Sequence, residues 1–534
     1  MTEVLVEPVR VPAQARRRRT FAVISHPDAG NSTLTEALAL YAEVIDTAGA
    51  VHGKAGRRGV TSDWMEMERK RGISITSAVL QFAYRDCVIN LLDTPGHGDF
   101  SEDTYRVLAA VDAAVMLLDA AKGLEPQTLK LFDVCRSRGI PVLTFVNKWD
   151  RPGREALELL DEVEQTIGLR PMPITWPLGI AGELRGLVEV ATGEFRRYSR
   201  TAGGATRAEA EAVPEAEIAA AEPEFWAAAQ DELALLQEIG AGFDEKDFLS
   251  GNATPVLFGA ALTGVGVRRL LDALVDLAPA PEPRDDADGN PRPLEAPTSG
   301  LVFKVQAGMD RAHRDRMAFV RICSGRFERG MVLTHAATGR PFATKYAQAV
   351  FGQQRTTVEE AFPGDIVGLV NAGALRPGDT LYSTDPVHFP AIPSFAPEHF
   401  AVVRGADSGA FKQFRRGIEQ LDSEGVIQVL VSDLRGEQAP VLAAVGPLQF
   451  EVVTSRLESE FRAPVTLEPL GYTITRRTDE AGAELLKGQS EVEVLTRRAD
   501  GVLLAVFSNK WRMETIRRKF DDLVLEPLPA GSVR

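Results

Sequence analysis

The segment SHPDAGNS, residues 25–32, constrains the fold more than any other part of the chain. It follows an apolar strand expected over residues 21–24 and precedes a stretch with helical spacing. A glycine-containing turn between a strand and a helix lets backbone N–H groups and the helix N-terminus surround a phosphate. The sequence therefore predicts a phosphate-binding loop (P-loop) made of Ser25, His26, Pro27, Asp28, Ala29, Gly30, Asn31, Ser32 and Thr33.

A second polar motif ends the apolar strand expected over residues 88–92. Its members are Asp93, Thr94, Pro95, Gly96 and His97. A carboxylate at this place can hold Mg²⁺ through a water molecule, and the glycine N–H can contact a γ-phosphate. A lone histidine after a glycine is more often a surface or packing residue. In this context, however, His97 is predicted to orient the attacking water as the catalytic residue.

The third motif, Asn147, Lys148, Trp149 and Asp150, closes a strand expected over residues 142–146. Its aspartate can accept hydrogen bonds from N1–H and the 2-amino group of guanine, a pair of donors that adenine lacks. The lysine stem can lie against the base, and the asparagine can hold this loop against the P-loop. The tetrapeptide is a weak signal alone, but its place after the two earlier motifs predicts a guanine-nucleotide site.

Two weaker signals complete the predicted site. A backbone N–H from Gly259, Ala260 or Ala261, after another expected strand, can reach the guanine O6. Between the first two motifs, a switch segment must supply a hydroxyl to Mg²⁺ and sense the γ-phosphate. Ser74 is the candidate for this hydroxyl, and Thr76 is the alternative. The predicted metal ligands are Ser32, Ser74 and, through water, Asp93.

Apolar strands alternate with amphipathic helices through residues 1–285, which predicts an α/β domain with a mostly parallel sheet covered on both faces. One helix carries its apolar residues on one side: Leu157, Leu160, Val163 and Ile167. An Ala- and Glu-rich segment at about residues 198–248 predicts an acidic helical insertion. We interpret this insertion as solvated and without chemistry.

The rest of the chain divides into a linker and two further domains. A Pro- and Asp-rich stretch, residues 278–293, lacks periodicity and predicts a linker. Short strands separated by turn residues predict an all-β barrel domain over residues 295–388. Mixed helical and strand patterns predict an α+β domain over residues 389–534. The expected fold is therefore a multidomain chain with a P-loop GTPase domain at its start.

Composition restricts the partners and the compartment. A net charge of −15 argues against non-specific nucleic-acid binding, and no DNA partner is expected. Local basic clusters, as consistent with RNA contact as with solvated surface, lie at residues 16–19, 412–416 and 510–519. Cys87, Cys135 and Cys323 lie far apart in apolar stretches, which predicts reduced core thiols. No apolar run approaches the roughly 20 residues of a membrane span and no signal segment is recognisable, so a cytoplasmic monomer is expected.

Longer strings resemble the bacterial peptide chain release factor 3 family, translational GTPases similar to elongation factors G and Tu. The strings are SDWMEMERKRGISIT at residues 62–76, DTPGHGDFSEDTYR at 93–106, PITWPLG at 173–179, FKVQAGMDRAHRDRMAFVR at 303–321, VEEAFPGDIVGL at 358–369, PSFAPEHF at 393–400 and VGPLQFEVV at 445–453. The resemblance runs nearly end to end. It implies a GTPase, with GTP or GDP and Mg²⁺ as cofactors, that acts on the ribosome after peptide release.

Such a GTPase promotes the departure of class I release factors and does not read stop codons itself. The resemblance implies contacts with rRNA and the proteins of the factor site, and an action on class I factors that is only indirect, on the ribosome. The Gly-Gly-Gln tripeptide of class I factors does not occur in the chain. An elongation-factor-G-like or ribosomal protection factor is less favoured, because the additional C-terminal domains of those factors are missing.

The chain departs from the family pattern at two positions. Many members have an acidic residue where this chain has Gly98, a change expected to be tolerated because the position follows the catalytic histidine. Asn31 replaces the P-loop lysine, and a neutral amide brings no charge to the phosphates. A charge-assisted contact of that kind is worth about 1.5–3 kcal/mol.

Three explanations of Asn31 stay open. The protein can be a variant with reduced nucleotide affinity and hydrolysis, or a cation such as Lys54, Arg57 or Arg58 can substitute for the lysine. Alternatively, it can be a hydrolysis-impaired module that binds guanine nucleotide weakly and occupies the ribosome without turnover. The leading hypothesis is a working GTPase with reduced nucleotide binding, because the guanine-reading motif and Ser32 are intact.

Overall fold

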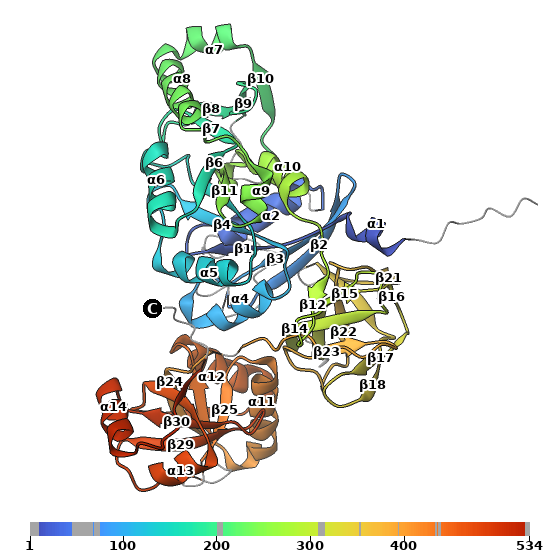
Figure 1. Ribbon diagram of the computed structural model, residues 1–534, viewed down its shortest axis with the longest axis vertical. Coiled ribbons are helices and arrows are strands. Elements are labelled where there is room, and N and C mark those ends of the chain that lie inside the picture. Colours follow the sequence, from blue (N-terminus) through green and yellow to red (C-terminus); the bar gives the residue numbers. More distant parts are fainter. Residues whose placement is uncertain are drawn as a thin grey trace, which may run out of the picture.

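The computed structural model describes residues 10–44, 68, 75–199, 207–307, 316–351, 354–393, 395–432, 435 and 439–528. Figure 1 shows three parts: an α/β domain at the top, a β-rich half-barrel at the lower right and an α+β domain at the lower left. The predicted fold class is confirmed.

The sheet of the α/β domain has the strand order β2-β3-β1-β4-β5-β11-β6. The strands are β1 (Arg18–Ser25), β2 (Ala78–Tyr84), β3 (Cys87–Asp93), β4 (Ala113–Asp119), β5 (Val142–Asn147), β6 (Arg170–Pro173) and β11 (Ala253–Phe258). All neighbours are parallel except β2, which is antiparallel to β3. The central strands are buried on both faces, as their continuous apolar runs require.

Helices cover both faces of this sheet. Phe21 and Val23 of β1 contribute to the core on one face, and Ala22 and Ile24 to the core on the other, because strand side chains alternate. The helices are α2 (Asn31–Tyr41) and α10 (Val267–Leu277) on the first face, and α4 (Ser101–Leu108), α5 (Pro126–Ser137) and α6 (Ala156–Ile167) on the second. A short helix, α1 (Val11–Ala15), precedes β1. On α6 the buried side includes Leu159, whereas the predicted Leu157 is only partly buried.

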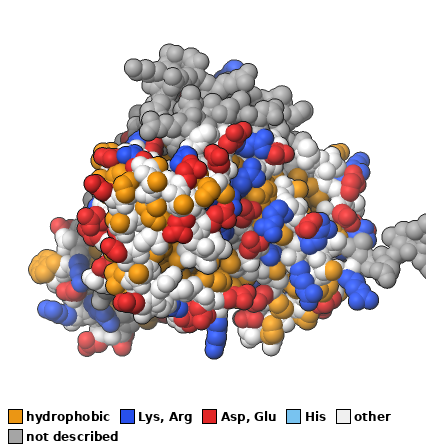
Figure 2. All heavy atoms as spheres, turned by 90° about the horizontal axis from the view of Figure 1, so that it is seen from above, with side chains coloured by type: hydrophobic (Ala, Val, Ile, Leu, Met, Phe, Trp, Pro, Cys, Tyr) orange, Lys and Arg blue, Asp and Glu red, His pale blue; other side chains and the backbone are white. Residues whose placement is uncertain are grey.

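The acidic excursion is larger and better packed than its composition indicates. It contains a four-stranded antiparallel sheet and three helices. They are β7 (Thr175–Leu178), β8 (Gly186–Glu189), β9 (Phe195–Tyr198), β10 (Ala210–Val213), α7 (Glu215–Ala221), α8 (Pro223–Glu238) and α9 (Glu245–Leu249). Trp226 and Leu233 of α8 are buried in one core with Trp176 and Phe195 of the small sheet. Figure 2, which views this end of the molecule, shows acidic and basic side chains interspersed rather than one acidic surface.

The predicted linker is an ordered connection. Strands β12 (Arg284–Asp285) and β13 (Pro291–Arg292) pair as a small hairpin. The Arg292 guanidinium is buried and donates hydrogen bonds to the Ser324 hydroxyl at 2.9 Å and the Asp385 carboxylate at 3.0 Å. The segment lacks periodicity because it is a hairpin of two-residue strands held by polar contacts.

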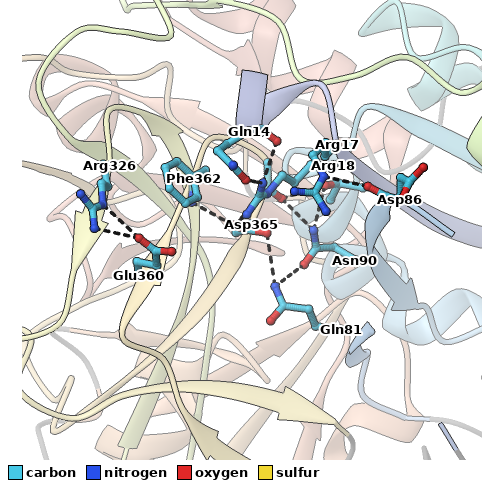
Figure 3. A network of polar contacts seen from close by, with 12 residues as sticks. Gln14, Arg17, Arg18, Gln81, Asp86, Asn90, Arg326, Glu360, Phe362 and Asp365 are labelled. Carbon is cyan, nitrogen blue, oxygen red and sulfur yellow. Dashed lines mark hydrogen bonds and ion pairs between the residues drawn. The ribbon is translucent and has the colours of Figure 1, made fainter. Parts of the chain in front are cut away.

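The half-barrel continues the sheet of the α/β domain. Its strands are β14 (Ser299–Ala307), β15 (Arg316–Ser324), β16 (Phe327–Glu328), β17 (Val332–His335), β18 (Arg340–Ala343), β19 (Ala347–Phe351), β20 (Gln354–Thr357), β21 (Glu360–Ala361), β22 (Ile366–Val370) and β23 (Thr380–Tyr382). Strand β19 pairs with β2 of the α/β domain. Figure 3 shows Arg18 of β1 facing Asp365 of the half-barrel, with Gln14 and Asn90 beside them.

The C-terminal domain has a sheet of order β27-β24-β26-β25-β29-β30-β28-β31. The elements are β24 (His399–Gly405), α11 (Phe411–Glu424), β25 (Gln428–Val431), β26 (Val441–Ala444), α12 (Leu448–Phe461), β27 (Val465–Leu470), β28 (Ile474–Thr478), α13 (Glu480–Leu486), β29 (Val492–Arg497), β30 (Leu503–Phe507), α14 (Lys510–Lys519) and β31 (Glu526–Pro527). Helices α11 and α12 pack together on one face of the sheet.

The expectations for the cysteines and for membrane-spanning helices can be compared with the residues that the structure describes. Cys87, Cys135 and Cys323 are buried and free, as predicted. Within the described ranges, no helix is both long and apolar enough to cross a membrane.

Candidate functional site

The loops that follow four strands meet at one edge of the α/β sheet. Strand β1 ends at Ser25, β3 at Asp93, β5 at Asn147 and β11 at Phe258. Because the carboxyl ends of parallel strands lie at the same edge, these loops come together there. They surround a cavity of about 390 Å³, within the size range of small-molecule sites. The cavity is lined by every predicted P-loop residue except Ala29, and by Thr94, Gly96, His97, Asn147, Lys148 and Asp150.

Gly30 fixes the shape of the P-loop. It has φ 103° and precedes the first turn of α2, so its backbone is in the region that favours glycine. A Cβ at this position would lie 2.6 Å from Nδ2 of Asn147, which shows how closely the third motif approaches. The same Nδ2 donates a hydrogen bond to the Ala29 carbonyl at 2.8 Å. The loop is thereby held with the N-terminus of α2 at the cavity.

Asn31, the first residue of α2, is directed toward the second motif. Its Nδ2 donates a hydrogen bond to the Thr94 carbonyl at 2.5 Å. Its Oδ1 is buried and has no hydrogen-bond partner among the described residues. The amide therefore links the P-loop to the end of β3 and brings no cation to the cavity.

The second motif packs tightly against the P-loop. A Cβ at Gly96 would lie 3.0 Å from the Pro27 backbone nitrogen, so only glycine fits without displacing the loop. The Thr94 hydroxyl donates to the Val23 carbonyl at 2.6 Å, which fixes the start of the motif on β1. The His97 side chain is about one-third exposed (35%) and lines the cavity.

Lys148 is held along the P-loop by two contacts. Its ammonium group donates to the Asp28 carbonyl and lies 2.8 Å from Oδ2 of Asp119. Burial raises the pKa of Asp119, but hydrogen bonds from Lys148 and the Ala121 N–H outweigh burial and lower that pKa below its usual value. The Lys148 charge is therefore matched by a carboxylate within the protein, and its stem remains beside the cavity.

Comparisons with known proteins agree with this geometry. Residues 16–280 match the elongation factor Tu GTP binding domain, residues 297–384 match elongation factor G domain 2, and residues 389–517 match the class II release factor RF3 C-terminal domain. A protein from Microcystis aeruginosa named peptide chain release factor 3 is 46% identical over 99% of this chain and 98% of its own length. The chain belongs to the peptide chain release factor 3 family.

Further relatives and one solved structure support this assignment. A protein of the same name from Gloeobacter violaceus is 50% identical over 87% of this chain and 88% of its own length. A crystal structure of a protein from Thermus thermophilus has a TM-score of 0.69, covering 90% of this chain and 73% of its own, at 21% identity. That structure shows similarity of fold. The family places the chain among the GTPases of translation termination.

Several predicted site residues lie outside the cavity lining. Trp149 is fully buried, and its ring lies edge-on to the Phe258 ring with 5.0 Å between the centroids. It therefore supports the loop by packing in the core. Ala29, Asp93 and Pro95 also do not line the cavity, and all three are buried. The motif patterns do not distinguish such buried residues from residues that face the cavity.

The loop after β11 contains the backbone N–H groups that were predicted to reach the guanine O6. The N–H groups of Gly259, Ala260 and Ala261 all donate to other groups of the protein, the last to Oδ1 of Asn147 at 2.8 Å. Leu262 is the residue of this loop that lines the cavity. Arg151 also lines it and was missed, because it follows the third motif without being part of the tetrapeptide pattern.

The predicted switch residues are only partly described. Ser74, the candidate Mg²⁺ ligand, lies outside the described residues, as do the possible substitute cations Lys54, Arg57 and Arg58. Thr76 is described, and its N–H and hydroxyl are hydrogen-bonded to Oε1 of Glu68 at 3.1 and 3.2 Å. The alternative hydroxyl is therefore directed to a carboxylate and not to the cavity.

Proposed function

We propose that this protein is a ribosome-dependent GTPase that promotes the departure of class I release factors after peptide release and does not read stop codons itself. One observation carries the proposal: residues of all three predicted motifs line a single cavity in a chain of the peptide chain release factor 3 family. We propose rRNA and the proteins of the ribosomal factor site as its partners, with class I factors reached indirectly. We also propose that it acts as a cytoplasmic monomer.

In the proposed mechanism, the P-loop binds the phosphates of GTP or GDP through backbone N–H groups and the N-terminus of α2. The Asp150 carboxylate accepts hydrogen bonds from the guanine edge, and the Lys148 stem lies against the base. Both side chains line the cavity beside the P-loop. The Gly96 N–H contacts the γ-phosphate, and His97 orients the water that attacks it.

The residues at the cavity suit Mg²⁺. Ser32 lines the cavity, and Asp93 is buried at the end of β3 beside it. These donors are oxygens, which Mg²⁺ prefers; Ser32 and Ser74 would hold the ion directly and Asp93 through water. A bound Mg²⁺ would neutralise phosphate charge. Among the described residues no group of three or more Asp, Glu, His or Cys side chains could hold a metal ion.

Asn31 sets the expected strength of nucleotide binding. Because its amide donates to the Thr94 carbonyl and is neutral, it adds no charge to the phosphates. Asn31→Lys is therefore expected to tighten GTP binding about 10- to 100-fold, the equivalent of a charged hydrogen bond. Titration with labelled GTP and GDP measures this. Equal affinities for the two proteins would show that Asn31 does not limit binding.

The decisive experiment measures GTP turnover and factor departure in the same reaction. Ribosomes carrying a fluorescent class I factor after peptide release are mixed with the protein and GTP, GDP or no nucleotide. The proposal expects phosphate release above the ribosome-only control and faster factor departure with GTP. His97→Ala is expected to abolish turnover while GTP affinity stays within about 2-fold, because this histidine contributes to the reaction and not to binding.

A second function is favoured by one observation, the absence of a P-loop cation at Asn31. In that case the protein is a hydrolysis-impaired module that occupies the factor site with guanine nucleotide bound. Phosphate release equal to the ribosome-only control, together with guanine-nucleotide-dependent ribosome binding, would identify the module and reject the GTPase.

A further inference from the structure

The string VGPLQFEVV, residues 445–453, lies outside the nucleotide cavity yet contacts Asp99, just after the second motif, across a domain boundary. Helix α12 begins within this string and lies on the side of the C-terminal domain that faces the α/β domain (Figure 1). The residue before the helix is Pro447, which forms no side-chain cap. Asp99 of the α/β domain supplies the cap instead, because its Oδ2 accepts the Leu448 N–H at 2.7 Å.

The loop before α12 leaves room for the Asp99 carboxylate. A side-chain carbon at Gly446 would overlap the Asp99 carboxyl group, so only glycine permits the contact. The Gln449 side chain accepts the N–H groups of Val445 and Gly446 at 2.7 and 3.1 Å and donates to the Val426 carbonyl at 2.7 Å. These bonds fix the turn before α12.

An apolar contact reinforces the polar one. Phe100, next to Asp99, is 6% exposed and packs in one cluster with Val452 of α12 and Ile75. Leu448 and Val426 of the C-terminal domain pack against the same cluster. The segment just after the second motif is therefore attached to α12 by a charged cap and a buried aromatic ring.

The same aspartate also holds the candidate catalytic histidine. Nδ1 of His97 lies 3.2 Å from the Asp99 backbone nitrogen and 3.3 Å from Oδ1 of its carboxylate. An unprotonated Nδ1 accepts from the N–H, and a protonated Nδ1 donates to the carboxylate. In either form this nitrogen is directed to Asp99, which leaves Nε2 as the nitrogen that can contact a water in the cavity.

We propose that Asp99 is a positioning residue that fixes the His97 ring while capping α12, so that docking of the C-terminal domain sets the orientation of the histidine. This inference rests on the proposed function, because it concerns how His97 is aligned for GTP hydrolysis. When the C-terminal domain leaves this segment, the Asp99 carboxylate loses its partner at Leu448 and is no longer fixed beside the His97 ring.

Asp99→Ala tests the link with three readouts. It is expected to lower the ribosome-stimulated kcat about 10-fold, with KM for GTP changed less than about 2-fold, because Asp99 does not line the cavity. Amide exchange at Leu448 should rise about 10-fold on loss of the charged cap. The Cε1 resonance of His97, in protein labelled with ¹³C-histidine, should shift.

Two further variants separate positioning from general destabilisation. Asp99→Asn keeps an acceptor for the Leu448 N–H and is expected to recover most of the lost kcat. Gly446→Ala leaves Asp99 intact but blocks its approach, and it is expected to reproduce all three effects of Asp99→Ala.

Asp479→Ala is the matched control. Asp479 caps α13 in the same way, with its Oδ1 accepting the Gly482 N–H at 2.7 Å, but within the C-terminal domain. It should leave kcat, Leu448 exchange and the His97 resonance unchanged. The proposal is overturned if Asp99→Ala leaves the His97 resonance and Leu448 exchange unchanged, or if Asp479→Ala changes them equally. Absence of ribosome-stimulated hydrolysis in the unmodified protein would reject the proposed function, while these two readouts would still test the link.

Discussion

The α/β domain is joined to the half-barrel and to the C-terminal domain by interfaces of different kinds. The half-barrel extends the central sheet through pairing of β19 with β2. Arg18 and Asp365 form a buried ion pair at 3.1 Å, with side chains 9% and 5% exposed. A second pair, Arg321 with Asp112, lies at 2.6 Å, with Arg321 buried and Asp112 partly buried. On the α/β side these residues belong to the sheet and to the segment before β4, away from the cavity.

The C-terminal domain is attached instead to the segment that lines or follows the cavity. Asp99 and Phe100 lie two and three positions after His97, and Arg106 of the next helix donates to the Gly425 carbonyl at 3.1 Å. The two interfaces therefore differ in position. The C-terminal domain contacts the segment next to His97, whereas the half-barrel extends the sheet and also reaches α4 through Lys304 and Asp103.

The comparison predicts the largest loss of stability at the half-barrel interface. Arg18→Ala leaves the Asp365 carboxylate buried without its cation and is expected to lower the free energy of unfolding by about 3–5 kcal/mol. Urea titration measures this. Arg326→Ala is the control, because Arg326 pairs with Glu360 at 2.9 Å on the surface of the same part (Figure 3), and such pairs contribute about 0–1 kcal/mol. Equal losses of unfolding free energy for Arg18→Ala and Arg326→Ala would show that the buried Arg18–Asp365 ion pair does not hold the half-barrel to the α/β domain.

A smaller effect of another kind is expected at the C-terminal interface. Phe100→Ala removes the aromatic ring from the cluster with Val452 and is expected to weaken docking by about 1.5–3 kcal/mol, while each domain remains folded. Calorimetry should show a separate, earlier transition, and proteolysis should increase between the half-barrel and β24. Phe411→Ala, at an exposed phenylalanine of α11, should change neither. A single cooperative transition in Phe100→Ala would contradict the distinction between the two interfaces.

Much of the cavity was predictable because its determinants are local. The residues that surround a phosphate must follow a buried strand within a few positions, so Gly30, Gly96 and Asp150 could be placed from spacing alone. Buried strands of the sheet were equally visible as continuous apolar runs. The family-like strings predicted the order of the three parts, although they carried no information on how the parts touch.

The remainder depends on partners that are distant in sequence. Asp99 and Leu448 are 349 positions apart, and nothing near either residue identifies the other. Trp149 resembles a site residue because it lies within a binding motif, but the core under the third motif buries it. Arg292 lies in a segment without periodicity, and its burial follows from contacts with Ser324 and Asp385.

The smallest predicted effect concerns pH and two buried carboxylates. Burial raises the pKa of Asp103 on α4, but the charge of Lys304 and hydrogen bonds from Ser77 outweigh it, so the pKa is lowered from 3.8. A carboxyl with a lowered pKa in the folded state stabilises the fold above pH 3.8, and this contribution is lost as pH falls through the folded-state pKa. Asp103→Asn should therefore cost most stability near neutral pH and progressively less in acid.

Asp365 at the half-barrel interface should behave in the opposite way. Burial raises its pKa above 3.8 despite the charge of Arg18, so its contribution is present below pH 3.8 and is lost as pH rises through the raised value. Urea midpoints from about pH 6 to about pH 3, compared with Asp365→Asn and Asp103→Asn, measure both differences. The stability difference from the unmodified protein should grow in acid for Asp365→Asn and shrink for Asp103→Asn. If the stability differences of Asp365→Asn and Asp103→Asn changed with pH in the same direction, Lys304 would not keep Asp103 ionised. The predicted electrostatic difference between the Asp103 and Asp365 contacts would then be wrong.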